Sequence, residues 1–267
     1  MKAISKLLDL LNKENYCRKY IKKIYRDSEI RFIYRTKFGF DIFVHPEKIL
    51  DILTTNQACD AELWMHAVQK LIKSLDVTVD VGANIGITSC WFSRISRTVY
   101  AFEPDSDNIK YLKDNLCLNK IRNVEVVPCV AGNINSEVDF YLRQSFGHHS
   151  ASKKHITKTK KSVRLPVVRL DDFLQKRGIT SISLLKIDVE GSEIDVLKGV
   201  EWYIKSKHIS LIVFEHAPVL FENNSQRIEV FDYLSKFGYR IFDVDHNMVE
   251  RKKMFDMEQG DFYAKPV

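Results

Sequence analysis

The chain has 267 residues, of which 45% are hydrophobic and 28% charged, and its formal net charge is +6. This length suits one α/β domain with an appendage, and so mild a charge does not by itself indicate a nucleic-acid-binding protein. The five cysteines are scattered without metal-ligand spacing, and no apolar run is long enough to span a bilayer. We therefore expect a reduced, cytoplasmic chain without a transmembrane segment.

Residues 1–60 predict an appendage made of a helix and a β-hairpin. Within residues 1–27, apolar side chains recur at helical spacing between lysines and arginines, which predicts a basic amphipathic helix. This helix would dock on the main domain, form a dimer contact or attach to an acidic membrane surface. Residues 29–44 alternate in polarity and predict a hairpin that turns near Lys37. Residues 60–75 predict a further helix.

Strands and helices alternate through residues 61–267 and predict a main domain with a doubly wound, mostly parallel α/β sheet. The predicted parallel strands are Val77–Val81, Thr98–Phe102, Val124–Pro128, Ser183–Val189 and Ile209–Phe214, and the antiparallel pair that closes the sheet is Tyr239–Val244 and Asp261–Lys265. The predicted helices are Ile87–Ile95, Ser106–Leu118, Asp171–Gly178, Glu193–Gly199 and Arg227–Gly238. Residues 137–170 break the alternation and predict a β-hairpin insertion with a polar tip.

Residues 79–86, VDVGANIG, predict a ligand-binding turn between the first sheet strand and its helix. The residues that would let the backbone approach a nucleoside closely are Gly82, Asn84 and Gly86. A dinucleotide fingerprint would require glycine at Asn84 and at Ile87, so the turn argues against NAD and FAD and favours S-adenosylmethionine. Asp80, within the same turn, could position the cofactor's ammonium group or brace the loop.

Acidic residues stand at the carboxyl ends of three of the predicted strands. Glu103 stands where nucleoside-binding α/β domains place an acid that accepts hydrogen bonds from the ribose hydroxyls. Asp188 and Glu190 could bind a substrate hydroxyl, a metal or the cationic groups of the cofactor. Glu215 and His216 end the next strand, so we expect both to lie near Asp188, with the histidine a candidate general base near neutral pH.

Four motifs resemble the FkbM-type family of S-adenosylmethionine-dependent methyltransferases, over roughly residues 60–265. They are VDVGANIG at 79–86, AFEP at 101–104, VRLDDF at 168–173 and LLKIDVEGSEIDVLKG at 184–199. The resemblance implies a Rossmann-like, seven-stranded class I methyltransferase sheet with helices on both faces and a reversed final strand. It also implies contacts to the cofactor from Gly82, Asn84, Gly86, Glu103 and Asp188, with Val130 and Ala131 beside the adenine.

Family members typically methylate hydroxyls of sugars or secondary metabolites. The resemblance therefore implies transfer of a methyl group from S-adenosylmethionine to a hydroxyl of a sugar or glycan, as in glycan biosynthesis on a polysaccharide, sugar nucleotide or glycosylated metabolite. Asp188, His216 and Glu215 are the candidates for the base or the group that orients the hydroxyl. Oxygen ligands at these strand ends could also hold Mg²⁺, although the sequence does not favour a metal.

The basic loop at residues 153–164 is either a solvated loop or an electrostatic collar for an acidic acceptor. At its start, His148, His149 and Ser150 occupy the place where the family tends to have a substrate loop, so they are expected substrate contacts together with Glu190. The lysines raise the alternative of RNA ribose methylation, but no aromatic-rich RNA surface accompanies them. A non-catalytic binding protein on a methyltransferase fold is the second alternative. The sequence names neither the acceptor nor the oligomeric state.

Overall fold

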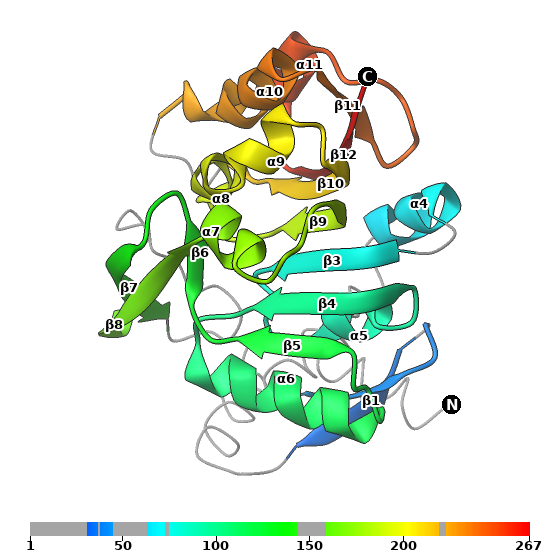
Figure 1. Ribbon diagram of the computed structural model, residues 1–267, viewed down its shortest axis with the longest axis vertical. Coiled ribbons are helices and arrows are strands. Elements are labelled where there is room, and N and C mark those ends of the chain that lie inside the picture. The colour runs from blue at the N-terminus through cyan, green and yellow to red at the C-terminus, as the bar shows by residue number, and fades with distance from the viewer. Residues whose placement is uncertain (1–30, 37, 45–62, 73–74, 144–158, 219–222) are drawn as a thin grey trace, which may run out of the picture.

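The computed structural model describes residues 31–36, 38–44, 63–72, 75–143, 159–218 and 223–267 (Figure 1). The predicted N-terminal helix lies outside these residues. So do His148, His149, Ser150 and part of the basic loop. Their predicted roles therefore stay predictions.

Seven strands form the central sheet in the order β11–β12–β10–β9–β3–β4–β5. Their bounds are β3 (Leu75–Val81), β4 (Ser96–Phe102), β5 (Val124–Val127), β9 (Ile182–Ile187), β10 (Ile209–His216), β11 (Tyr239–Asp243) and β12 (Gly260–Pro266). Strands β3, β4, β5, β9 and β10 pair in parallel, whereas β12 runs antiparallel to both of its neighbours. The predicted seven-stranded sheet with a reversed final strand is thus confirmed.

The alternation of side chains along β3 explains how helices come to cover both faces of the sheet. Val77, Val79 and Val81 point into one core, whereas Asp80 lies on the opposite face with a second core built around Trp91. The second core lies under α4 (Leu63–Leu71), α5 (Ile87–Phe92) and α6 (Ser106–Leu118). The first core lies under α7 (Leu170–Gln175), α8 (Glu193–Gly199), α9 (Glu201–Lys205), α10 (Gln226–Lys236) and α11 (Arg251–Asp256).

Two smaller sheets flank the central one. The predicted N-terminal hairpin is present as β1 (Phe32–Arg35) and β2 (Asp41–Val44), and two asparagines, Asn115 in α6 and Asn119 at its C-terminal cap, accept hydrogen bonds from the backbone of β2. The predicted insertion is larger than a hairpin, because β6 (Val130–Gly132) joins β7 (Ser136–Arg143) and β8 (Thr159–Arg169) in the order β6–β8–β7. Figure 1 shows this three-stranded sheet beside the carboxyl ends of β4 and β5.

The boundaries of several elements differ from the prediction. Strand β3 begins at Leu75, so the preceding helix stops earlier than expected, and α5 ends at Phe92 because the chain turns tightly into β4. The short helices α9 and α11 were missed, since one and a half turns show little periodicity.

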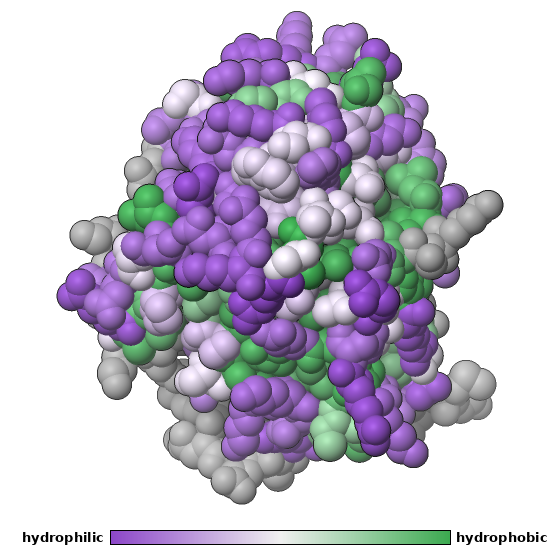
Figure 2. Space-filling view, viewed as in Figure 1, coloured by the Kyte–Doolittle hydropathy of each residue, from purple (hydrophilic) through white to green (hydrophobic). Residues whose placement is uncertain are grey.

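The outer surface shows no dominant apolar area on the face seen in Figure 2. That face is mostly hydrophilic, with hydrophobic side chains gathered in small separate patches. No helix in the described part of the chain is both long and apolar enough to cross a membrane.

Candidate functional site

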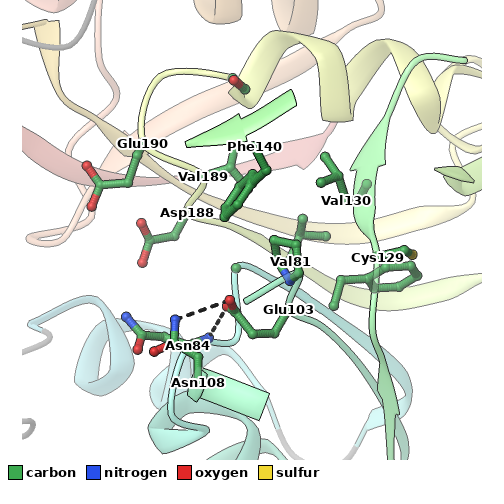
Figure 3. A pocket seen from close by; sticks show the side chains of 15 residues that line it. Val81, Asn84, Glu103, Asn108, Cys129, Val130, Phe140, Asp188, Val189 and Glu190 are labelled. Carbon is green, nitrogen blue, oxygen red and sulfur yellow. Dashed lines mark hydrogen bonds between the residues drawn. The ribbon is translucent and has the colours of Figure 1, made fainter. Parts of the chain in front are cut away.

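A cavity opens at the carboxyl ends of β3, β4 and β9 (Figure 3). Seven predicted site residues line it: Gly82, Asn84, Glu103, Val130, Ala131, Asp188 and Glu190. The other described residues in its lining are Val81, Phe102, Pro104, Asn108, Cys129, Phe140, Val189 and Ser192. The cavity therefore brings together most of the residues predicted to bind the cofactor and two of the carboxylates predicted on the acceptor side, Asp188 and Glu190, but not Glu215 or His216.

The glycine turn has the shape that the sequence predicts, for two different reasons. At Gly82, φ is +78° and a Cβ would lie 1.8 Å from the carbonyl oxygen of Asp188, so the two loops touch through their backbones. At Gly86, φ is +89° and a Cβ would lie 2.2 Å from Leu112 Cδ1. Gly82 thus shapes the cavity wall, whereas Gly86 allows α6 to pack against the turn and does not itself line the cavity.

Glu103 is buried and holds the glycine turn in place by hydrogen bonds. Its carboxylate accepts hydrogen bonds from the backbone N–H of Asn84 at 2.8 Å and of Asp105 at 2.9 Å, and from Asn108 Nδ2 at 3.2 Å (Figure 3). A carboxylate can accept about four hydrogen bonds, which leaves Glu103 capacity for one further donor from a ligand. Burial raises the pKa of Glu103 to about 7, against the opposing effect of these donors.

Asp80 braces the turn and does not line the cavity. Its Oδ2 accepts hydrogen bonds from Thr88 Oγ1 at 2.7 Å and Ser89 Oγ at 2.6 Å, both in the first turn of α5. Two roles were predicted for Asp80, positioning the cofactor's ammonium group and bracing the loop, and these hydrogen bonds support the second.

Lys186 connects the two sides of the cavity, and sequence reasoning missed it. Its Nζ donates a hydrogen bond to Gly82 O at 2.9 Å and lies 3.2 Å from Asp188 Oδ2 and 3.4 Å from Asp80 Oδ1. It is the only lysine or arginine that is buried within the described part of the chain. A charged side chain inside the apolar strand LLKI was the signal, because a buried ammonium requires anionic or carbonyl partners.

The strand ends beyond Asp188 carry partly buried carboxyl groups, but Glu215, a predicted site residue, and Asp261 do not line the cavity. Burial, followed by the nearby charge of Asp188, raises the pKa of Glu215 to about 8 and that of Asp261 to about 6. Glu215 Oε1 also accepts a hydrogen bond from Gln259 Nε2 at 2.9 Å. No group of three or more His, Cys, Asp or Glu side chains is arranged to hold a metal ion among the residues that the structure describes.

His216 does not meet the expectation that it lies near Asp188 in the cavity. Neighbouring residues of a strand point to opposite faces, so His216 turns away from the side that carries Glu215 and packs edge-on against Phe262 in the first core. It is 2% exposed, and burial lowers its pKa to about 4, which leaves the ring neutral at pH 7. The predicted role of general base therefore has no support from its position.

Comparison with known proteins finds methyltransferases among the relatives of the chain. The chain is 31% identical over 144 residues to Hexuronic acid methyltransferase AglP of Haloferax volcanii, a match that covers 54% of this chain and 57% of that protein. It is 32% identical over 167 residues to 31-O-demethyl-FK506 methyltransferase FkbM of Streptomyces tacrolimicus, a match that covers 51% and 63% of the two chains. Each match thus spans less than two thirds of the relative.

Among solved structures, methyltransferase FkbM from Methylobacillus flagellatus aligns with a TM-score of 0.49 and 17% identity, over 82% of this chain and 54% of that one. The model of the methyltransferase FkbM domain matches residues 80–241, which include the glycine turn, Glu103 and the strand that carries Lys186. The chain therefore belongs to the methyltransferase FkbM domain family.

Proposed function

We propose that the chain is an S-adenosylmethionine-dependent O-methyltransferase that acts on a hydroxyl of a sugar or glycan. The observation that carries this proposal is the single cavity in which the glycine turn and Glu103 face Asp188 and Glu190 (Figure 3). Family membership supports methyl transfer. The name of one relative, a hexuronic acid methyltransferase, supports a sugar as the acceptor, and the name of the other, a 31-O-demethyl-FK506 methyltransferase, supports an oxygen as the methylated atom.

The lining of the cavity fits a nucleoside cofactor that is cationic. Its described residues include the carboxylates of Glu103, Asp188 and Glu190 and no lysine or arginine. Such a lining suits a ligand with a sulfonium and an ammonium group, whereas the pyrophosphate of a dinucleotide would meet like charge. The apolar side chains at the other end are Cys129, Val130, Ala131 and Phe140, which suit the flat faces of a base.

The chain's own residues then have separate tasks. S-adenosylmethionine, when bound, supplies a methyl group on a cationic sulfur, open to in-line attack by an acceptor oxygen. Asp188 lines the cavity and has Oδ2 held by Lys186, so we assign it to orient the acceptor hydroxyl and take up its proton. Glu215, with its pKa raised to about 8, is protonated at neutral pH and suits a hydrogen-bond donor better than a base.

The decisive test is mass spectrometry of hexuronic-acid-containing glycans and sugar nucleotides after incubation with labelled S-adenosylmethionine. We expect one acceptor to gain the labelled methyl group. Asp188→Asn should reduce turnover by about 10²- to 10⁴-fold and lower the affinity for S-adenosylhomocysteine in calorimetry by a much smaller factor. A wild-type chain that shows no saturable binding of S-adenosylhomocysteine would remove the proposed function.

A further inference from the structure

Glu193 is a buried carboxyl group that has no task in the proposed reaction. It is the first residue of α8, is 3% exposed, and does not line the cavity. Its Oε1 accepts hydrogen bonds from the backbone N–H of Gly191 at 3.0 Å and of Val189 at 3.4 Å. Burial raises the pKa of Glu193 to about 7, although the N–H groups of Gly191, Glu193 itself and Val189 oppose this shift. Because burying a carboxylate is unfavourable, the groups that it holds indicate why it is there.

The donors to Glu193 belong to the loop of residues 188–192, which connects β9 to α8 and builds part of the cavity wall. Four residues of this loop line the cavity: Asp188, Val189, Glu190 and Ser192. At Glu190 φ is +55° and at Gly191 it is +99°, so two successive residues adopt the left-handed conformation. For a glutamate this conformation costs on the order of 1 kcal/mol, and it persists only where the surroundings impose it.

The hydrogen bonds to Glu193 supply that constraint. The two donors are the residues immediately before and after Glu190, so one carboxylate holds the chain on both sides of the strained residue. Capping of α8 does not account for these bonds, because both donors precede the helix. The side chains of Asp188 and Glu190 point the same way in Figure 3. Burial, and then the charges of Asp188 and Glu190, raise the pKa of Glu215, so both carboxylates face one region.

We propose that Glu193 is a positioning residue for the acceptor site. By holding the backbone on both sides of Glu190, it sets the direction in which Asp188 and Glu190 point towards the acceptor hydroxyl. This inference rests on the proposed function, which supplies the acceptor and the task of Asp188. Loss of Glu193 should therefore act on turnover through the two carboxylates of the loop, while the glycine turn still binds the cofactor from the other wall.

The test compares two variants of the full chain at pH 8, Glu193→Met and Asp195→Leu. Methionine has about the length of glutamate but no oxygen that can accept the two N–H groups, so the loop loses its anchor. Asp195 is the matched control: it is also an acid in the first turn of α8, but its Oδ1 accepts a hydrogen bond from Asn133 Nδ2 at 2.9 Å, outside the loop.

The two readouts are calorimetry with S-adenosylhomocysteine and the transfer of labelled methyl groups to a mixture of hexuronic-acid-containing glycans and sugar nucleotides. We expect turnover of folded Glu193→Met to fall by about 10²-fold, because the two carboxylates are displaced, and its affinity for S-adenosylhomocysteine to change by a much smaller factor. Asp195→Leu should have the turnover of wild type. Glu193→Gln retains an acceptor oxygen and should stay within about fivefold of wild type.

Three results would overturn the inference while the proposed function stands: folded Glu193→Met keeps the turnover of wild type, Asp195→Leu loses as much turnover as Glu193→Met, or Glu193→Gln does. Hydrogen exchange of wild type needs no variant, so a misfolded variant cannot protect the inference. The amide of Gly191 must exchange slowly, and exchange as fast as in an unstructured peptide would also overturn it. A wild-type chain that binds no S-adenosylhomocysteine, or transfers no methyl group to the mixture, would remove the proposed function and the inference together.

Discussion

The two sides of the cavity are held in different ways. On the side of the glycine turn, Glu103 is fixed by backbone N–H groups, and Gly82 touches the backbone of Asp188. On the other side, Asp188 is paired with Lys186, the buried positive charge, and behind it burial and then the charge of Asp188 raise the pKa of Glu215. The first side is held in place by backbone geometry, whereas the second is held by charge.

The largest expected effect comes from Gly82→Ala on the side held by backbone geometry. The new Cβ would lie 1.8 Å from Asp188 O at a φ of +78°, so the two loops must separate. We expect the free energy of unfolding to fall by about 3 kcal/mol and the binding of S-adenosylhomocysteine to be lost. Urea unfolding and calorimetry measure these effects.

Gly178→Ala is the matched control, because Gly178 also has a positive φ of +68° but nothing lies within 4 Å of its added Cβ. Gly178→Ala should lower the free energy of unfolding by only about 1 kcal/mol. Equal losses in the two variants would show that the contact between the loops is not what makes Gly82 necessary.

Lys186→Met tests the side that depends on charge, and we expect the free energy of unfolding to fall by about 2–3 kcal/mol. The change leaves Asp80, which is fully buried, without its cation and frees the Gly82 carbonyl. Turnover should fall more than cofactor affinity, since Asp188 loses the group that orients it. Lys198→Met is the control: its ion pair with Glu229 is exposed and should contribute at most about 0.5 kcal/mol. A stable Lys186→Met variant with normal turnover would contradict the proposed connection.

Glu103 should make cofactor affinity depend on pH. Its pKa of about 7 leaves it mostly protonated at pH 6, and a hydroxyl donor binds better to the ionised form. Affinity for S-adenosylhomocysteine should therefore rise about fivefold between pH 6 and pH 8. Glu103→Gln should bind weakly at every pH, whereas Glu125→Gln, on the exposed surface, should behave as wild type. An affinity of wild type that stays flat across this range would argue against a ribose contact through Glu103.

Glu215→Gln is expected to have the smallest effect, which grows as pH rises from the ordinary glutamate pKa of 4.5 to about 8. The raised pKa means that the folded state binds a proton that the unfolded state has already lost, so stability falls as pH rises towards and through about 8. The neutral amide of the glutamine variant does not ionise, so its stability does not change with pH for this reason. The variant should match wild type at low pH and be more stable by about 1 kcal/mol at pH 9, in denaturant titrations at both pH values. A variant that is less stable than wild type at pH 9 would mean that the ionised Glu215 stabilises the folded state.

Local patterns predicted the elements that repeat strongly. The alternation of apolar strands and helices predicted a mostly parallel sheet closed by an antiparallel pair, and the glycine turn with Glu103 predicted one wall of the cavity. These predictions succeeded because they depend on neighbours along the chain: side-chain period, glycine backbone freedom and the edge of the sheet at which parallel strands end.

Contacts between residues far apart in the sequence could not be predicted from such local patterns. His216 was expected beside Asp188, but Phe262 and α11 enclose it on the other face of the sheet. Asn108 reaches the cavity only because α6 begins directly behind Glu103, and Phe140 enters it from the inserted sheet.

The sequence by itself therefore determined the family, the doubly wound sheet and the wall of the cavity that backbone geometry builds. The tertiary structure alone decided which carboxylates face the cavity, which are buried as braces, and that one lysine lies between them. The physical reason is that a side chain's charge state and direction depend on what packs around it, and those neighbours come from strands and helices far apart in the chain.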